Sequence, residues 1–123
     1  MLPIFIHSFV YSVYIFYDII YIMPRNTTSS AVFFYVYALE SLSDGKRYIG
    51  YTNNLRRRLE EHRNGQCFAT KFRLPFQLIY FEGCLCDEDA KRREGYLKTS
   101  QGNRFLSLRL IIYKRLSALG TGR

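Results

Sequence analysis

A β-hairpin pattern over residues 32–52 is the feature that most constrains how this chain can fold. The stretches VFFYVYALE (residues 32–40) and RYIGYT (residues 47–52) are rich in the β-branched and aromatic residues that favour strands. Between them, Ser43-Asp44-Gly45-Lys46 has turn chemistry, because Asp-Gly supplies residues that readily adopt a positive φ. The sequence therefore predicts two adjacent antiparallel strands.

The residues after the hairpin predict one helix, a third strand and the start of a second helix. Asn53 or Asn54 can cap a helix through the basic stretch LRRRLEEH, and Gly65 ends it after Asn64. A loop leads from there into a strand at FQLIYFE, residues 76–82. Three acidic residues, Asp87-Glu88-Asp89, begin the second helix, since the helix dipole favours negative charge at this end.

The residues from Asp87 onward predict two helices. We expect the first to run to about Thr99, a break at Gln101-Gly102-Asn103, and a final helix from Arg104 to Leu119. The element order is then β-β-α-β-α-α. This order predicts an α+β domain in which helices flank a small mixed or antiparallel three-stranded sheet.

The first 30 residues differ in character from the rest. Residues 1–23 form an apolar, aromatic run long enough to span a bilayer as a helix, but His7 and Asp18 interrupt it. A secretory signal would open with positive charge and end in small residues, and this run does neither. Three interpretations stay open: a membrane anchor, an extra element of the domain, or sequence upstream of a start at Met23. We divide the chain into an extension with a polar linker (1–30), a domain (31–119) and a tail (120–123).

Charge and cysteine content narrow the class of protein. The net charge is +8, and the two charged residues before Ala31, Asp18 and Arg25, cancel, so the excess lies in the domain. A basic small domain suggests nucleic acid or an anionic membrane as partner. The three cysteines are odd in number and Cys84-Leu85-Cys86 lacks the spacing of a zinc knuckle, so we interpret them as reduced thiols of a cytoplasmic protein.

Strand parity decides which tyrosines share a face of the hairpin. If Asp44-Gly45 is a two-residue loop, Tyr48 lies opposite Ser41. Tyr35 and Tyr37 then share the face of Tyr48 but lie too far along the strand to touch it. A longer loop of the same parity would bring the tyrosines together, so parity allows a tyrosine cluster without establishing it.

Helical phase separates the charged residues of the two predicted helices. In the first, Arg58 and His62 lie beside the apolar stripe of Leu55 and Leu59 and point toward the sheet, whereas Arg57 points to solvent. In the second, Glu94 shares an inward stripe with Ala90 and Leu97. A carboxylate there is costly to bury without a partner. It is either in a surface ion pair with Lys98, or it binds a metal or an arginine.

Other cations surround these elements. Four of them are candidate nucleic-acid-binding residues, because each could contact a phosphate: Lys71, Arg73, Lys98 and Arg104. Taken singly, a residue of this kind is more often a solvated surface residue.

Four sequence blocks together resemble the GIY-YIG nuclease superfamily, in particular its small stand-alone single-domain bacterial-type members. The blocks are FFYVYALES, DGKRYIGYT, LRRRLEEH and REGYLKTSQGNRFL, which occur in order between Phe33 and Leu110. The combination is far more specific than YIG alone. The resemblance implies a metal-dependent endonuclease that hydrolyses phosphodiester bonds in DNA, in repair, recombination or defence, and no small-molecule cofactor.

The resemblance also implies roles for five residues. Glu94 would bind the divalent metal, usually Mg²⁺ with Mn²⁺ as the alternative, and Arg58 would stabilise charge on the scissile phosphate. Tyr48 would orient or deprotonate the attacking water, with Tyr35 and His62 in the supporting hydrogen-bond network.

The chain departs from the family pattern in three places. Phe33-Phe34 replaces the Gly-Ile before the first tyrosine, Tyr37 is a rival for the role of Tyr35, and Asn103 comes too early to match the asparagine of larger relatives. A catalytically inactive nucleic-acid-binding module of the same fold is the alternative. Membrane attachment through residues 1–23 and the oligomeric state stay open.

Overall fold

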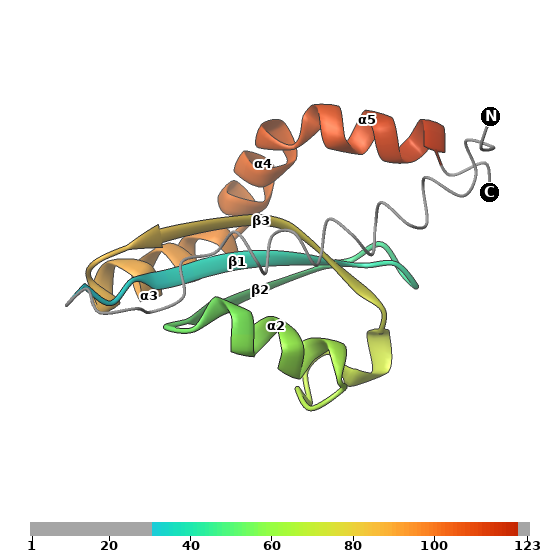
Figure 1. Ribbon diagram of the computed structural model, residues 1–123. Helices are drawn as coiled ribbons and strands as arrows, with labels where there is room; N and C mark the ends of the chain where they lie inside the picture. The colour runs from blue at the N-terminus through green and yellow to red at the C-terminus, as the bar shows by residue number, and fades with distance from the viewer. Residues whose placement is uncertain (1–30, 121–123) are drawn as a thin grey trace, which may run out of the picture.

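The computed structural model describes residues 31–120, and the interpretations offered for residues 1–23 lie outside this range (Figure 1). The elements in chain order are β1 (Phe34–Ser41), β2 (Arg47–Thr52), α2 (Leu55–Arg63), a 3-10 turn (Lys71–Arg73), β3 (Phe76–Cys84), α3 (Asp87–Leu97), α4 (Ser100–Arg109) and α5 (Ile111–Gly120). All three strands are antiparallel, in the order β2-β1-β3. The predicted fold class is confirmed. None of the helices described is long and apolar enough to cross a membrane.

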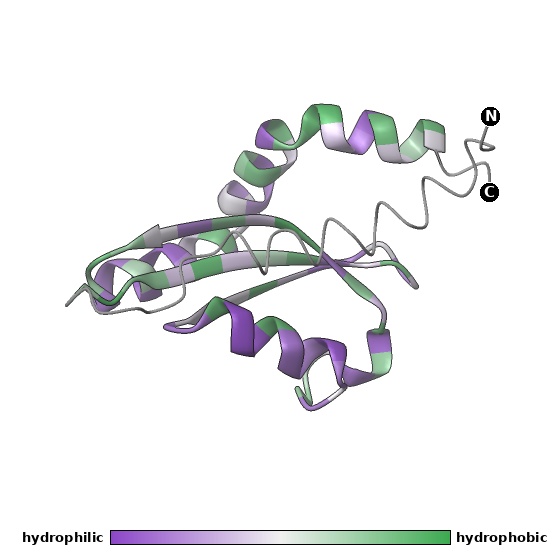
Figure 2. Cartoon of the chain, in the orientation of Figure 1, coloured by the Kyte–Doolittle hydropathy of each residue, from purple (hydrophilic) through white to green (hydrophobic). Residues whose placement is uncertain are grey.

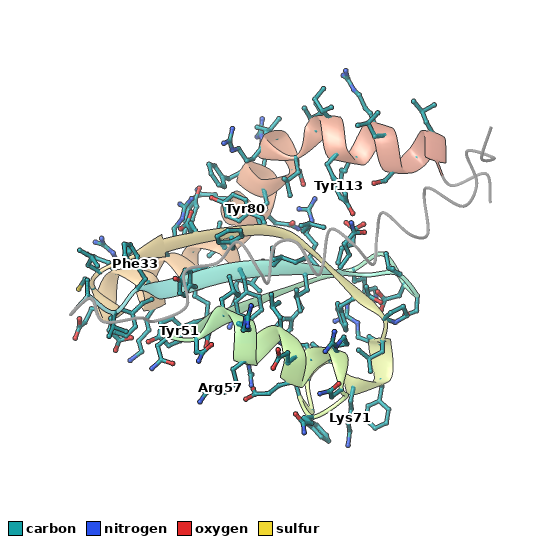
Figure 3. All side chains as sticks on the ribbon, viewed as in Figure 1. Phe33, Tyr51, Arg57, Lys71, Tyr80 and Tyr113 are labelled. Carbon is teal, nitrogen blue, oxygen red and sulfur yellow. The ribbon has the colours of Figure 1, made fainter. Side chains whose placement is uncertain are left out.

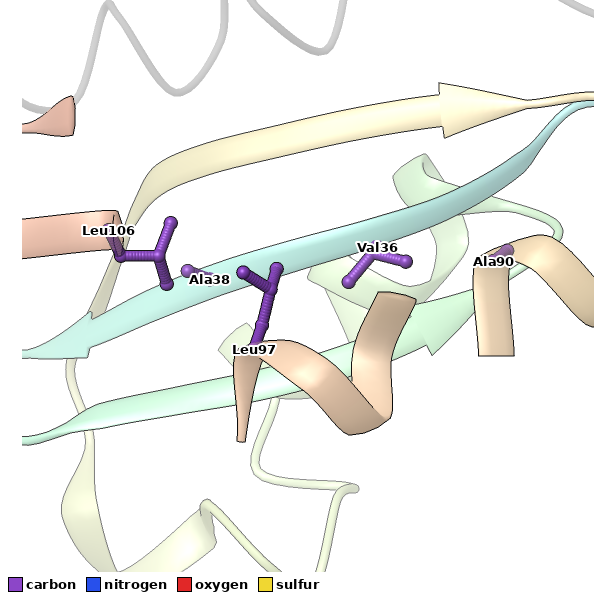
Figure 4. Close-up of a cluster of buried hydrophobic side chains, with 5 residues drawn as sticks. All are labelled: Val36, Ala38, Ala90, Leu97 and Leu106. Atoms are coloured by element: carbon purple, nitrogen blue, oxygen red, sulfur yellow. The ribbon is translucent and has the colours of Figure 1, made fainter. Parts of the chain in front are cut away.

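Helices cover both faces of the sheet, because alternate residues of β1 point to opposite sides. On one side, Tyr37 and Leu39 of β1 pack against Leu55 and Leu59 of α2. On the other side lies a second core cluster, drawn in Figure 4, made of Val36, Ala38, Ala90, Leu97 and Leu106. Burying each leucine contributes on the order of 1.5–3 kcal/mol. Strand β1 supplies residues to both clusters, so both cores depend on it.

The hairpin loop is longer than two residues, which is the second of the two cases that the sequence left open. Glu40 pairs with Arg47, and the Ser41 N–H donates to the Lys46 carbonyl at 3.0 Å, which leaves residues 42–45 as the loop. The Ser41 hydroxyl accepts a hydrogen bond from the Asp44 N–H at 3.3 Å, and Gly45 adopts a φ of +69°. These side-chain and backbone contacts stabilise the longer loop.

The longer loop keeps the predicted parity and shifts the register by two residues. Tyr37 is therefore opposite Gly50, and Leu39 is opposite Tyr48. Odd-numbered residues of β1 and even-numbered residues of β2, which share a face of the sheet, now lie opposite one another. This pairing is the condition for a tyrosine cluster on the face that α2 covers.

Helix α2 has the capping residues that the sequence predicts. The Asn54 side chain accepts the Arg57 N–H at 3.1 Å, which makes Asn54 the N-cap. Gly65 follows the C-cap residue Asn64 with a φ of +72°, a conformation that glycine adopts without strain.

The breaks in the C-terminal helices differ from the prediction. The first helix ends at Leu97, and Thr99 caps α4 by accepting the Gly102 N–H on its hydroxyl at 3.1 Å. Gly102 is therefore helical, and its missing side chain has another purpose: a Cβ there would collide with the carbonyl of Tyr96. A second break at Leu110 divides the predicted final helix into α4 and α5.

Helix α5 buries no residue, and the green bands on its ribbon in Figure 2 mark its hydrophobic residues. Tyr113 is a residue of α5 that points back to the sheet (Figure 3). Its hydroxyl lies 3.5 Å from the Glu40 carboxylate and 3.4 Å from the Gln77 side-chain oxygen.

Candidate active site

Tyr37 and His62 form the centre of a polar cluster between β1 and α2. The Tyr37 hydroxyl lies 2.8 Å from His62 Nε2, and the two residues are 0% and 2% exposed. Tyr48 completes the cluster, since its ring centroid is 5.1 Å from that of His62 and 6.3 Å from that of Tyr37. The sheet and α2 thus bring two tyrosines and one histidine together.

Gly50 makes room for this arrangement. It lies opposite Tyr37 in the strand pairing, and a Cβ added to Gly50 would fall on the outer end of the Tyr37 ring. The glycine of the YIG stretch is therefore required for close approach: it allows the tyrosine of β1 to lie across β2 and reach the helix.

Directional hydrogen bonds fix the tautomer of His62. Its Nδ1 lies 2.7 Å from the hydroxyl of Thr70, and that hydroxyl donates to the Cys67 carbonyl at 3.4 Å. The Thr70 oxygen therefore accepts from Nδ1–H, and Nε2 is left as the acceptor for the Tyr37 hydroxyl. Thr70 is fully buried, and no feature of the sequence marks it as part of the cluster.

Burial keeps both central residues neutral. The pKa of His62 is lowered to about 4, first by burial and then by the positive charge of Arg58. Burial also raises the pKa of Tyr37 well above its ordinary value, with the hydrogen bond from Arg58 acting in the opposite direction. At neutral pH this pair can orient neighbouring groups, but Tyr37 is a poor proton acceptor.

Arg58 links the buried centre to the surface. Its Nε donates to the Tyr37 hydroxyl at 3.4 Å, and its guanidinium contacts Glu61 at 2.9 Å and the Cys67 sulfur at 3.5 Å. Its pKa is raised, chiefly by Glu61. The side chain is 32% exposed, whereas that of Arg57 is 65% exposed, as the helical phase predicts. Arg58 therefore offers a fixed positive charge beside Tyr37.

Glu94 makes the ion pair with Lys98 that was one of its two interpretations, and its role as a metal ligand stays a prediction. It lies on the stripe of α3 that buries Ala90 and Leu97, and it also pairs with Lys98, whose Nζ is 2.8 Å from its carboxylate. The Glu94 side chain keeps 24% exposure. A carboxylate held by one mobile ammonium remains accessible to another cation.

An open cleft lies beside Tyr48 and Lys98. The cleft has a volume of about 640 Å³ and runs between the β2 edge and the C-terminal helices. Tyr48 lines one side and Lys98, the partner of Glu94, lines the other. Further polar and basic residues line it as well: Lys46, Arg47, Thr99, Ser100, Asn103, Ser107 and Lys114.

The donor set suits a hydrated metal ion. Within residues 31–120, no three His, Cys, Asp or Glu side chains gather into a group that could hold a metal alone. Mg²⁺ does not need such a group, because it keeps several waters and is commonly bound by one or two carboxylates together with substrate phosphates. Glu94 fits that requirement.

Tyr35 lies on the same face as Tyr37 but has different neighbours. Its ring packs against Phe33, with centroids 6.4 Å apart, and against the backbone of Gly83. Tyr35 also packs against the core cluster that contains Tyr37, but it is Tyr37 that bonds to His62. The assignment of Tyr35 to the first motif stays a prediction. Tyr37, its rival, contacts both His62 and Tyr48.

The four predicted nucleic-acid-binding residues belong to different parts of the fold, with two of them in one turn. Lys71 and Arg73 belong to the turn before β3, Lys98 lines the cleft, and Arg104 is exposed on α4. The Arg73 guanidinium binds both carboxylate oxygens of Asp44, at 2.8 and 3.3 Å, which ties the hairpin loop to β3 and depresses the pKa of Asp44. Arg73 therefore has a structural partner, and its nucleic-acid role stays a prediction.

Known proteins resemble this chain over the same region. The GIY-YIG catalytic domain matches residues 33–105. A UPF0213 protein of Streptococcus pneumoniae (serotype 4, strain TIGR4) is 44% identical over 77 residues, which cover 59% of this chain and 77% of that protein. A UPF0213 protein of Clostridium perfringens (strain 13) is 42% identical over 76 residues, 60% and 80% of the two chains. The solution NMR structure of a UPF0213 protein from Bacillus halodurans shares 34% identity at a TM-score of 0.41, covering 63% and 84%.

Proposed function

The chain belongs to the GIY-YIG catalytic domain family, together with the small bacterial UPF0213 proteins, and we propose from this that it is a metal-dependent endonuclease acting on DNA. One observation carries the proposal: a neutral His62–Tyr37 pair, Tyr48 and the cation Arg58 meet at one place within the matched domain. Phosphodiester hydrolysis needs positive charge at the phosphate and an oriented water, and this cluster supplies groups for both.

Arg58 is proposed to bind the scissile phosphate. Its guanidinium is permanently charged, partly exposed, and aimed by Tyr37 and Glu61, so it need not reorganise when charge develops on the phosphoryl oxygens. Arg57 also pairs with Glu61, at 3.5 Å, but its side chain is 65% exposed on the outer face of the same helix, so it serves as the matched control.

Tyr48 is proposed to orient the attacking water, and Tyr37 to take the supporting role for which the sequence suggested Tyr35. Tyr48 borders the cleft, whereas Tyr37 is buried with its hydroxyl committed to His62. His62 then acts by holding Tyr37 in place, with its own orientation fixed by Thr70. This division follows from exposure, because only a group that reaches the surface can touch substrate, and Tyr37 is fully buried.

Glu94 is proposed to hold the divalent metal, Mg²⁺ or Mn²⁺, which supplies Lewis-acid polarisation of the phosphate when bound. Lys98 and the other cations that line the cleft would contact phosphates along the strand, which makes affinity fall as salt rises. The role of the reaction in repair, recombination or defence follows from the resemblance alone.

The test compares the wild-type protein with Glu94→Gln, Tyr48→Phe, Arg58→Ala and Arg57→Ala on single-stranded, nicked, branched and duplex DNA with Mg²⁺. We expect Glu94→Gln and Arg58→Ala to lower cleavage by about 100-fold or more and Arg57→Ala to have little effect, since one preorganised electrostatic contact is worth about that much. Equal cleavage by all five proteins would point to a contaminating nuclease. Salt-dependent binding without cleavage would favour an inactive binding module.

A further inference from the structure

Two phenylalanines of the loop between α2 and β3 are almost fully exposed. Phe68 is 78% and Phe72 is 82% exposed, the former before the 3-10 turn and the latter within it. Their rings meet edge to face, with centroids 6.3 Å apart and an interplanar angle of 83°. We call these two residues and Lys71 the aromatic platform. Figure 3 labels Lys71 beside the turn that precedes β3.

A cation lies between the two rings. The Lys71 ammonium is 4.8 Å from the centroid of each ring, within the range of cation–π attraction. The platform therefore combines flat apolar surfaces with one fixed positive charge. A purely apolar patch would suit another protein surface, but rings that surround an ammonium suit a ligand with a π face next to an anion.

The same loop supplies structural partners to the active site. Thr70, between the two phenylalanines, is fully buried and bonded to His62, and Cys67, next to Phe68, contacts Arg58. The loop thus has an inner side that fixes the catalytic cluster and an outer side that presents the platform. A ligand on the outer side would therefore contact the same short loop whose inner side contacts Arg58 and His62.

We propose that the aromatic platform stacks an unpaired nucleobase of the substrate, with Lys71 contacting the adjoining phosphate. A base supplies the π face, its phosphate supplies the anion, and the excess charge of +8 on the chain attracts that phosphate. The base must be unpaired, because a base inside a duplex has its faces covered by its neighbours. This inference rests on the proposed function and specifies the form of nucleic acid that the site receives.

Binding in EDTA tests the platform without any cleavage. The fluorescence anisotropy of a labelled single-stranded oligonucleotide, the same strand with abasic sites, and a duplex is measured for the wild-type protein and for Phe68→Ala/Phe72→Ala. We expect the variant to bind the single strand about 10-fold or more weakly and the duplex within about twofold of wild type, since stacking on an aromatic side chain contributes this much per base. The abasic strand should bind both proteins alike.

Two further variants separate stacking from other causes. Phe68→Leu/Phe72→Leu keeps apolar surface and removes the π faces, so it should bind the single strand nearly as weakly as the alanine variant. Lys71→Gln should reduce the slope of log affinity against log salt by about one.

The outcomes distinguish this inference from the proposed function. Equal single-strand affinity for wild type and both double variants would overturn the platform, even if cleavage depends on Glu94. Full single-strand affinity in the leucine variant would also overturn it, because apolar surface without a π face would then be sufficient. Loss of single-strand binding in a protein that never cleaves DNA would support the platform and refute the nuclease.

Discussion

The Tyr37 hydroxyl donates to Nε2 of His62 across 2.8 Å, and this one bond joins the central strand to α2 inside the core. Neither group can reach bulk water, since Tyr37 is 0% and His62 2% exposed. The candidate active site is therefore also part of what holds the domain together. Variants of these residues have to be judged for folding as well as for activity.

Removing the Tyr37 hydroxyl should destabilise the domain. Tyr37→Phe leaves His62 Nε2 without its buried donor, and an unsatisfied buried polar group costs about 1–3 kcal/mol. Tyr35→Phe is the matched control, because Tyr35 packs mainly through its ring, and we expect less than about 0.5 kcal/mol. Urea unfolding of both variants measures the difference. Equal destabilisation would show that Tyr35 has a buried partner as important as His62.

The stability of the fold should fall as the pH drops from about 6.5 to about 4, because His62 stays neutral in the folded protein over this range. The unfolded chain takes up this proton near pH 6.5, while the folded protein, with a pKa of about 4, does not. Below pH 6.5 the unfolded state therefore binds more protons, and up to about 3 kcal/mol of stability is lost by pH 4. Above pH 6.5 this contribution is constant.

His62→Gln isolates that contribution. Glutamine retains one donor group and one acceptor, so the difference in unfolding free energy between wild type and variant should vary with pH only below about 6.5. NMR titration of the His62 ring provides the direct measurement. A ring that titrates near pH 6.5 in the folded protein would disprove the burial effect.

A methyl group on Gly50 should disrupt the cluster. In Gly50→Ala the new Cβ would overlap the Tyr37 ring, and displacing a packed ring typically costs about 1–3 kcal/mol. Gly95→Ala is the control: Gly95 lies within α3 with no atom near the added Cβ, so alanine should stabilise the protein by about 0.5–1 kcal/mol. Thermal unfolding should therefore shift in opposite directions. A neutral Gly50→Ala would mean that Tyr37 can leave the cluster at little cost.

Local chemistry and periodicity accounted for much of this fold. Asn54 and Gly65 bound α2 as their side-chain and backbone properties require, and Arg57 and Arg58 separate as a period of 3.6 residues demands. These features depend on residues within one or two turns. The hairpin register did not follow in the same way, because Asp44-Gly45 fits loops of several lengths and the Ser41 side chain selects one of them.

The parts that sequence reasoning missed depend on distant contacts. Gly102 looks like a helix breaker, yet it is a contact point for the carbonyl of Tyr96. Thr70 orients His62 from eight residues away, through a loop with no periodic pattern. Tyr37 takes the central place, with Tyr35 beside it, only because of a register shift of two residues. The correct register would have placed Tyr37 opposite Gly50 and shown that Tyr37, not Tyr35, lies at the centre of the cluster.

Glu94 and Lys98 permit a test of metal binding that does not depend on catalysis. Glu94→Gln should abolish the binding of Mn²⁺ to the domain, because the amide removes the charged ligand. Lys98→Met should tighten Mn²⁺ binding by about twofold to fivefold, since the ammonium 2.8 Å from the carboxylate then no longer competes. An exposed ion pair is worth about 0.2–1 kcal/mol, which limits the gain to that range.

Lys91→Met is the matched control for this effect. Lys91 pairs with Asp87 on the same helix, again four residues apart and at 2.6 Å, but no metal is assigned to Asp87. Titration of Mn²⁺ followed by electron paramagnetic resonance, without nucleic acid, should therefore leave this variant like wild type. If Glu94→Gln binds Mn²⁺ as tightly as wild type, the metal has another ligand. If Lys91→Met and Lys98→Met tighten binding equally, the gain reflects the net charge of α3 and not competition for Glu94.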